Sequence, residues 1–172
     1  MNPVEVGIIT VSDRASSGEY DDRSGPIVRQ LISGQPGWQV VEEAVVPDEQ
    51  DQIAALLVQW ADERRLPLIL TTGGTGFSPR DVTPEATRAV IEREAPGLAE
   101  AMRSASLQVT PHAMLSRAVC GIRGVSLIVN LPGSPRAARE NLLVLLPVLP
   151  HAVELLTGAS GAESGHQRTQ RA

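Results

Sequence analysis

Leu68-Ile69-Leu70-Thr71-Thr72-Gly73-Gly74-Thr75-Gly76 is the stretch from which the rest of this sequence can be interpreted. A short apolar run ends abruptly here, and three glycines in four positions follow it. Glycines let a ligand approach main-chain N–H groups closely, and successive N–H groups of this kind form sites for anions. The loop therefore predicts a phosphate-type pocket, with a tight strand-to-loop turn as the plainer alternative. It matches neither the Walker loop nor the dinucleotide-binding glycine pattern.

The glycine loop follows the last of three apolar runs that predict strands. These runs cover residues 4–11, 38–46 and 66–71. Helices are expected after Pro26 and after Pro47, and this alternation is typical of a mostly parallel sheet with helices on its faces. Two later runs, at 117–122 and 125–131, are joined by Arg123-Gly124 and predict a hairpin. The sheet should therefore be mixed.

Polar segments follow all three of these strands. Ligands of open parallel sheets bind beyond the carboxyl ends of the strands. That edge would bring together Ser12-Asp13, Asp48 and the loop that ends at Asp81. Mg²⁺ commonly lies between one or two carboxylates and substrate phosphates, so Asp48 and Asp81 are candidate metal ligands. The plainer alternative for Asp48 is a helix N-cap, whereas for Asp81 we expect Thr83 to take that role.

Helices are predicted on both sides of this hairpin. Thr83 should cap a helix that runs to about residue 94. Ser134 is placed to cap a final helix at about 135–156, which is apolar nearly all round and should be buried. Proline interrupts helices, so Pro147 or Pro150 should kink or split it.

Composition and length place limits on the class of protein. The 172 residues predict one domain at 1–157, and the Gly/Ser/Gln/Arg-rich segment 158–172 predicts a flexible tail. A net charge of −5 argues against non-specific nucleic-acid binding. The single cysteine, Cys120, allows no internal disulfide and indicates a reducing cytoplasm. No signal peptide is recognisable, and the longest apolar run, 142–150, falls well short of the ~20 residues of a membrane span.

Seven segments carry a further signal when they are taken in order. They are Val11-Ser12-Asp13-Arg14-Ala15-Ser16-Ser17-Gly18, Ser24-Gly25-Pro26-Ile27, Val46-Pro47-Asp48-Glu49, Thr71-Thr72-Gly73-Gly74-Thr75-Gly76, Arg80-Asp81-Val82-Thr83-Pro84-Glu85-Ala86-Thr87, Leu115-Ser116-Arg117 and Asn130-Leu131-Pro132-Gly133-Ser134-Pro135. Together they closely resemble the MogA/MoaB family of molybdenum-cofactor biosynthesis proteins over about residues 4–156. The first segment resembles MogA more than MoaB, and the sequence departs from longer bacterial members by a shorter stretch around 143–150.

The resemblance implies an α/β fold, a three-layer α/β/α sandwich with a mostly parallel mixed sheet, and a molybdopterin adenylyltransferase. Such enzymes transfer AMP from ATP to the terminal phosphate of molybdopterin, release pyrophosphate and use Mg²⁺. The family's two critical aspartates match Asp48 and Asp81, which we expect to be catalytic and to bind the metal. The residues expected to bind substrate are Ser12, Asp13, Thr72, Gly73, Gly74, Thr75, Gly76, Pro132, Gly133 and Ser134. Turn roles for Ser12 and Asp13, and a helix cap for Ser134, are the plainer alternatives.

Two other functions are considered beside this one. A MoaB-like oligomer that binds molybdopterin without catalysis is the alternative, and the retention of both aspartates counts against it. Molybdate insertion by the related E-type domain would require further domains, which this sequence does not contain. The resemblance also implies a homotrimer and a MoeA-like molybdate-insertion protein as a partner. Arg14 and Arg80 are candidates, from loop position alone, for neutralising phosphate charge.

Overall fold

A single six-stranded sheet organises residues 3–158, which the computed structural model describes. Its order is β2-β1-β3-β6-β5-β4; β2, β1, β3 and β6 run parallel, and β5 is antiparallel to both of its neighbours. The predicted parallel core and the predicted hairpin are both confirmed. The strands are β1 (Val4–Val11), β2 (Trp38–Val46), β3 (Leu68–Thr72), β4 (Arg93–Glu94), β5 (Cys120–Arg123) and β6 (Ser126–Leu131).

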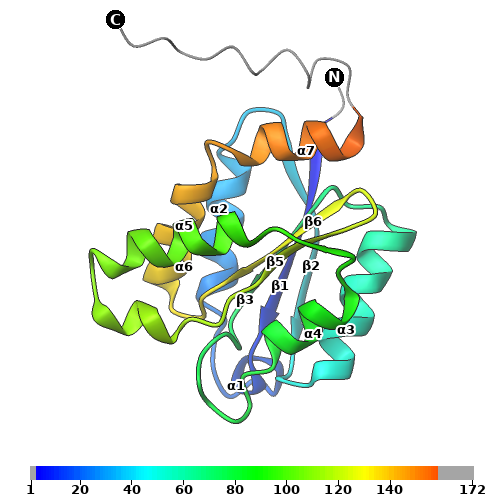
Figure 1. The fold of residues 1–172 in the computed structure, drawn as a ribbon. Helices are drawn as coiled ribbons and strands as arrows, with labels where there is room; N and C mark the ends of the chain where they lie inside the picture. Colours follow the sequence, from blue (N-terminus) through cyan, green and yellow to red (C-terminus); the bar gives the residue numbers. More distant parts are fainter. Residues whose placement is uncertain (1–2, 159–172) are drawn as a thin grey trace, which may run out of the picture.

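Helices cover both faces of this sheet, which confirms the expected three-layer sandwich (Figure 1). One face carries α2 (Ser24–Ser33), α5 (Pro96–Leu107), α6 (Pro135–Leu145) and α7 (Leu149–Thr157). The other carries α3 (Gln50–Val58), its π-helical continuation η1 (Gln59–Glu63) and α4 (Thr83–Val90). Two short elements lie in connections: α1 (Asp13–Ser16) and the 3₁₀ turn η2 (Pro111–Leu115).

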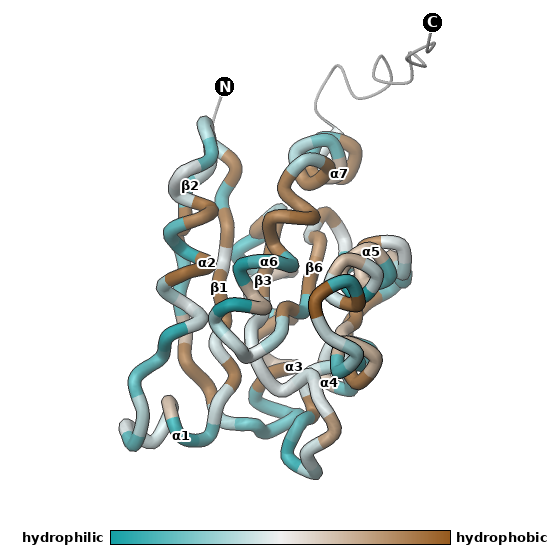
Figure 2. The backbone as a smooth tube through the Cα atoms, turned by 90° about the vertical axis from the view of Figure 1, so that its left-hand side faces the viewer, coloured by the Kyte–Doolittle hydropathy of each residue, from teal (hydrophilic) through white to brown (hydrophobic). Residues whose placement is uncertain are grey.

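The strands divide their side chains between two cores because successive residues of a strand point to opposite faces. Ile8 and Leu70 pack in the core under α2, α5, α6 and α7. Their neighbours Ile9 and Ile69 pack in the core under α3 and α4. Figure 2 shows hydrophobic residues recurring along the strands, whereas the loop that carries α1 is largely hydrophilic. The aromatic content is only 2%, so aliphatic side chains make most of the core, and the sheet divides this core in two.

Four connections meet at the carboxyl edge of the sheet. The chain moves from β1 to one side for β2 and then crosses to the other side for β3. In open α/β sheets such a reversal opens a crevice between the loops that follow the two central strands. Here those loops begin at Ser12 after β1 and at Gly73 after β3. The loops after β2 and β6 flank them.

Helix α4 is shorter than predicted, because sheet pairing competes with the helix. It ends at Val90, and Ile91 is already extended at φ −73° and ψ 147°. Arg93 and Glu94 then pair with Ile122 and Gly121 of β5. The predicted helix to residue 94 is therefore wrong, and β4 takes its last residues.

The final helix is split as predicted, but it is less buried than predicted. The break falls after Leu145, and α6 and α7 are bent by 64°. Only one side of each helix reaches the core, so Leu143 of α6 and Leu155 of α7 keep 39% and 53% of their surface exposed. Within the described residues no single helix is long and apolar enough to cross a membrane, although this bent pair passes by length and composition when taken together. The predicted tail, apart from Gly158, lies outside the described residues.

Candidate functional site

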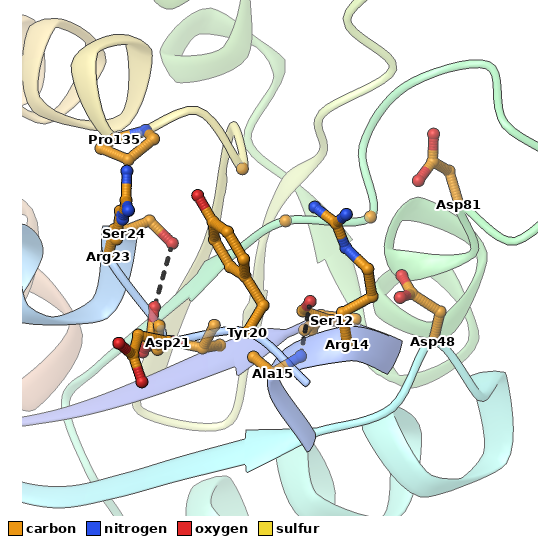
Figure 3. A pocket seen from close by; sticks show the side chains of 16 residues that line it. Ser12, Arg14, Ala15, Tyr20, Asp21, Arg23, Ser24, Asp48, Asp81 and Pro135 are labelled. Atoms are coloured by element: carbon orange, nitrogen blue, oxygen red, sulfur yellow. Dashed lines mark hydrogen bonds between the residues drawn. The ribbon is translucent and has the colours of Figure 1, made fainter. Parts of the chain in front are cut away.

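The loops at the carboxyl edge enclose a cavity of about 380 Å³, which we call the acidic cavity (Figure 3). Both predicted catalytic aspartates line it, and so do four of the residues expected to bind substrate. The sequence positions that meet here are separated by up to about 120 residues, and the sheet topology brings them together. The residues that line it include Ser12, Arg14, Tyr20, Asp22, Arg23, Asp48, Gly73, Gly74, Asp81 and Gly133.

Asp13 and Asp48 bind each other through their backbones. The Asp13 N–H donates to the Asp48 carboxylate at 2.9 Å, and the Asp48 N–H donates to the Asp13 carboxylate at 3.0 Å. This exchange locks the loop after β1 to the loop after β2. Glu49, not Asp48, occupies the N-cap position of α3, so the capping alternative for Asp48 is excluded. Asp13 itself does not line the acidic cavity.

Arg80 completes this lock from the glycine loop side. Its guanidinium donates to both carboxylate oxygens of Asp13 at 2.9 and 3.0 Å and to Glu49 at 2.8 Å. The hydrogen bond from Arg80 lowers the pKa of Asp13, and the same carboxylates raise the pKa of Arg80. Arg80 thus holds three loops in register. Its charge is already matched by protein carboxylates, which does not favour the phosphate role suggested by its position.

Asp48 carries a charge that the protein does not neutralise well. Burial raises the pKa of Asp48 above its ordinary value, and the negative charges of Asp13 and Asp81 raise it further. An oxyanion in such surroundings favours a bound cation. No group of three or more His, Cys, Asp or Glu side chains in residues 3–158 is arranged as a complete metal site. Two carboxylates that need further oxygens from elsewhere fit Mg²⁺ bound together with a phosphorylated ligand.

Asp81 lies at the far end of the glycine loop. Its carboxylate accepts from the Ser78 N–H at 2.9 Å, while its own N–H donates to the Ser78 carbonyl. The prediction that Thr83 caps α4 is wrong: Val82 occupies the cap position, and the Thr83 hydroxyl donates to the Gly73 carbonyl at 2.9 Å. Thr83 is buried and ties the glycine loop to α4.

The glycines are required by the backbone as much as by any ligand. Gly73 and Gly74 have φ values of +100° and +65°, which side chains disfavour. A Cβ on Gly74 would lie 2.3 Å from the Thr83 hydroxyl and 3.0 Å from an Asp48 oxygen. The Gly73 N–H donates to Leu131, but the N–H groups of Gly74 and Thr75 donate to no acceptor in the described chain. Unpaired donors of this kind are what an anion-binding loop requires.

A second cavity, of about 450 Å³, lies beyond the same loop, and we call it the apolar cavity. The loop is shared: Gly73 and Gly74 line the acidic cavity, whereas Thr75 and Gly76 line the apolar one. The segment after β6 is shared in the same way, because Gly133 lines the first cavity and Pro132 and Ser134 line the second. The remaining wall comes from α5, the connection after it, η2 and α6. Its residues include Ser106, Val109, Ala113, Leu115, Ala137 and Asn141.

Three of the predicted substrate-binding residues make structural hydrogen bonds within the protein. Thr72 is fully buried, and its hydroxyl donates to the Pro132 carbonyl at 2.7 Å, which joins the glycine loop to the loop after β6. Ser134 caps α6 by accepting from Ala137, as predicted, while it also lines the apolar cavity. Ser12 combines the same two features, because it caps α1 by accepting from Ala15 and lines the acidic cavity.

Arg117 is a residue that we did not single out from the sequence. Its guanidinium donates to the carbonyls of Gly76 and Asp81 and pairs with Glu85, and its N–H donates to Thr75 at 2.9 Å. The loop between Gly76 and Asp81 is therefore closed by one side chain. An arginine directly after the Leu115-Ser116 pair was a visible signal, but its partners are more than 30 positions away.

The sheet order and the crevice place this protein in the class of open α/β folds, whose ligands bind beyond the carboxyl ends of the strands. Comparison with known proteins identifies the family. Residues 7–151 match the family described as a probable molybdopterin binding domain, and this chain belongs to that family.

The relatives of this chain extend the comparison to named proteins. The chain is 42% identical over 171 residues to the molybdopterin adenylyltransferase of Escherichia coli K12, with 92% of the chain and 88% of the relative covered. It is 48% identical over 160 residues to gephyrin of Dictyostelium discoideum, covering 88% of the chain but only 22% of gephyrin's length. The crystal structure of the molybdopterin biosynthesis enzyme MoaB from Thermus thermophilus superposes with a TM-score of 0.85 at 54% identity, covering 90% of this chain and 97% of that one.

Proposed function

We propose that this protein is a molybdopterin adenylyltransferase that transfers AMP from ATP to the terminal phosphate of molybdopterin and releases pyrophosphate. The observation that carries the proposal is the shared glycine loop, which separates an acidic cavity from an apolar one. Two bulky substrates that each end in phosphate could occupy the two cavities and meet at this loop. The likeness to the E. coli enzyme named for this activity supports the same conclusion.

The reaction needs positioning more than covalent chemistry. An oxygen of the pterin's terminal phosphate attacks the α-phosphorus of ATP, the bond to the bridging oxygen breaks, and its electron pair leaves with pyrophosphate. Both reactants are anions, so the site must hold them close and offset their charge. The unpaired N–H groups of Gly74 and Thr75 supply donors at the junction of the cavities. The apolar cavity suits the pterin ring, and the acidic cavity suits the nucleotide phosphates.

Mg²⁺ is the cofactor that best fits the acidic cavity. Asp48 and Asp81 would hold it. Burial, together with the negative charges of Asp13 and Asp81, raises the pKa of Asp48, and a bound cation would offset this cost of its charged form. When bound, the ion would neutralise phosphate oxygens during transfer. The protein's own part is to fix the two carboxylates: Asp48 through the Asp13 N–H, and Asp81 through the Ser78 N–H.

The test is an adenylation assay with purified protein, Mg²⁺, ATP and molybdopterin. The native protein should form adenylated molybdopterin, and Asp81→Asn should lower turnover by about a hundredfold or more while molybdopterin still binds. Asp62→Asn is a matched control, because Asp62 pairs with Arg123 and does not line the cavity. Normal turnover in Asp81→Asn would show that the role assigned to Asp81 is wrong. Binding of molybdopterin with no ATP-dependent product would instead identify a binding protein of the non-catalytic kind.

The family resemblance also leads us to propose an oligomeric state, a cellular location and a partner protein. A cytoplasmic homotrimer that delivers adenylated molybdopterin to a MoeA-like insertion protein is the arrangement that we propose. Exposed apolar side chains, among them Phe77, Val109 and Met114 at 56–67% exposure, offer surface for protein contacts. Sedimentation equilibrium of the full chain should give three times its mass of 18.3 kDa, and a monomer would exclude the trimer.

A further inference from the structure

Tyr20 stands between two arginines on the wall of the acidic cavity. The Arg14 guanidinium lies 4.9 Å from the centre of the Tyr20 ring, and the Arg23 guanidinium lies 5.1 Å from it. Figure 3 shows the three side chains in a row, with Arg14 on the side of Asp48 and Asp81. All three line the cavity, and the tyrosine keeps 43% of its surface exposed. We call this row the arginine wall.

The arginine wall is fixed at both ends rather than lying on a free loop. The Tyr20 N–H donates to the Arg14 carbonyl at 3.1 Å, which folds the loop back on α1. Beyond Tyr20, the Asp22 carboxylate accepts from the Gly25 N–H at 3.0 Å and from the Thr10 hydroxyl at 2.7 Å. These bonds attach the loop to α2 and to β1. Cations held near an aromatic face are attracted by its quadrupole, so the ring keeps both guanidinium groups in place.

The two guanidinium groups of the wall are not neutralised by the protein. Within residues 3–158, neither Arg14 nor Arg23 makes an ion pair, whereas Arg80 and Arg117 are paired with carboxylates. Two acidic side chains of the same loop also line the cavity. Asp22 is occupied by the hydrogen bonds just described, and Asp21 forms no ion pair with either arginine in the described part of the chain. Two unpaired positive charges facing a cavity, held apart by a ring, match a ligand with several anionic oxygens.

We propose that Arg14 and Arg23 bind the two outer phosphates of the nucleotide, the ones that leave as pyrophosphate, and that Tyr20 positions them. The identity of this polyanion rests on the proposed function. Negative charge grows on the pyrophosphate as its bond to the α-phosphorus breaks, and guanidinium groups already in place stabilise that charge. Asp48 and Asp81 lie on the other side of Arg14 in Figure 3. There they would hold the cation near the α-phosphate. The arginine wall therefore fixes the orientation of the nucleotide in the cavity, with its outer phosphates at Arg14 and Arg23.

The probe for this proposal is inorganic tripolyphosphate, titrated calorimetrically with Mg²⁺ into the full-length protein. Arg14→Gln and Arg23→Gln should each weaken binding about tenfold. Tyr20→Leu should weaken it severalfold, and Tyr20→Phe should restore native binding because the ring remains. Arg29→Gln is the control: it removes the same charge from an exposed side chain that pairs with Glu43 and does not line the cavity. Circular dichroism of each variant verifies that it folds.

The outcomes separate this proposal from the proposed function. The phosphate-binding role of Arg14 and Arg23 would be wrong if both arginine variants bound tripolyphosphate with native affinity, or if the native protein did not bind it. Adenylation assays with the same variants should show an increased KM for ATP and an unchanged KM for molybdopterin. If the variants adenylate molybdopterin with the native KM for ATP, the proposed phosphate role of Arg14 and Arg23 is wrong, whereas the proposed adenylyltransferase function is supported. If tripolyphosphate binding depends on the two arginines but the native protein forms no adenylated product, their phosphate-binding role is supported and the adenylyltransferase function is wrong.

Discussion

The carboxylates of Asp13 and Asp48 each accept a hydrogen bond from the other residue's backbone N–H, at 3.0 and 2.9 Å. Neighbouring parallel strands β1 and β2 deliver these two residues to the same edge of the sheet. The exchange fixes the Asp48 side chain toward the acidic cavity before any ligand arrives. Preorganised charge of this kind is what catalysis by positioning requires.

Replacing Asp48 by Asn should separate stability from activity. The amide oxygen of Asn can still accept from the Asp13 N–H, but the unneutralised charge disappears. We expect turnover to fall about a hundredfold, while the free energy of unfolding at pH 7 stays equal to that of the native protein or rises. Urea denaturation together with the adenylation assay checks both expectations. A strongly destabilised Asp48→Asn would show that the charge of Asp48 contributes to the fold.

The pH dependence of this effect follows from the direction of the pKa shift. The folded pKa of Asp48 lies above the ordinary value of 3.8, so the folded state binds its proton more tightly than the unfolded state. The native protein therefore loses stability at this residue as pH rises from 3.8 through the raised pKa, and the loss is complete above it. Unfolding free energies of the native protein and Asp48→Asn should converge as pH is lowered toward 3.8. A gap that widens in acid would contradict the shift.

Removing the Asp13 carboxylate should loosen the site without removing a catalytic group. Asp13→Ala leaves Arg80 with Glu49 as its only carboxylate partner in the described chain and frees the Asp48 N–H. We therefore expect turnover to fall about tenfold with little change in KM for molybdopterin. Glu49→Gln is the matched control, since Glu49 is the other carboxylate bound by Arg80 but has no bond to Asp48. Equal losses in the two variants would mean that Arg80, and not the contact between the aspartates, sets the geometry.

Gly74 should not tolerate a methyl group. Gly74→Ala imposes a side chain at φ +65° and brings its Cβ against Thr83 and Asp48, so it should destabilise the fold by about 1–3 kcal/mol and lower turnover. Gly97→Ala is the control, because Gly97 is in α5 and a Cβ there would meet nothing within 4 Å. Thermal denaturation compares the two. A native-like Gly74→Ala would show that the loop can relax away from Asp48.

Arg117→Lys should disturb the loop that carries Asp81. A lysine cannot bridge the carbonyls of Gly76 and Asp81 and the Glu85 carboxylate at once. We expect turnover to fall about tenfold with an increased KM for Mg²⁺, because Asp81 loses its fixed position. Arg88→Lys, at an exposed ion pair with Glu94 of 3.7 Å, should leave both values unchanged. An unchanged KM for Mg²⁺ in Arg117→Lys would remove Arg117 from the support of Asp81.

Much of the fold was predictable because its signals are local. Apolar runs, glycine breaks and helix-starting prolines located the parallel core, the hairpin and the split near Pro147. The failures came from tertiary competition. Helix α4 loses its last turn because Arg93 and Glu94 gain a strand partner in β5, and no pattern near residue 94 indicates that pairing. The Thr83 cap failed for the same reason, since its hydroxyl is bound by the distant Gly73 carbonyl.

The sequence indicated which residues would meet at the edge of the sheet, but not that they would line two separate cavities. Topology alone placed Asp48, Asp81 and the glycine loop at one edge, and the structure brings all of them to the acidic cavity or its border. That Gly73 and Thr75 would line different cavities depends on backbone φ values that a sequence does not specify. Loop position indicated Arg14 as a candidate for phosphate charge, but not its arrangement with Tyr20 and Arg23. That arrangement, like the role of Arg117, depends on side-chain contacts that no spacing rule captures.

The central claim is transfer of an adenylyl group, and ATP labelled at the α-phosphorus tests it most directly. Purified protein, Mg²⁺ and molybdopterin are incubated with the labelled nucleotide, and both products are quantified. We predict that the label appears on molybdopterin together with an equal amount of pyrophosphate, and that Asp81→Asn gives neither. Saturable molybdopterin binding by the native protein with no label transferred would contradict the account.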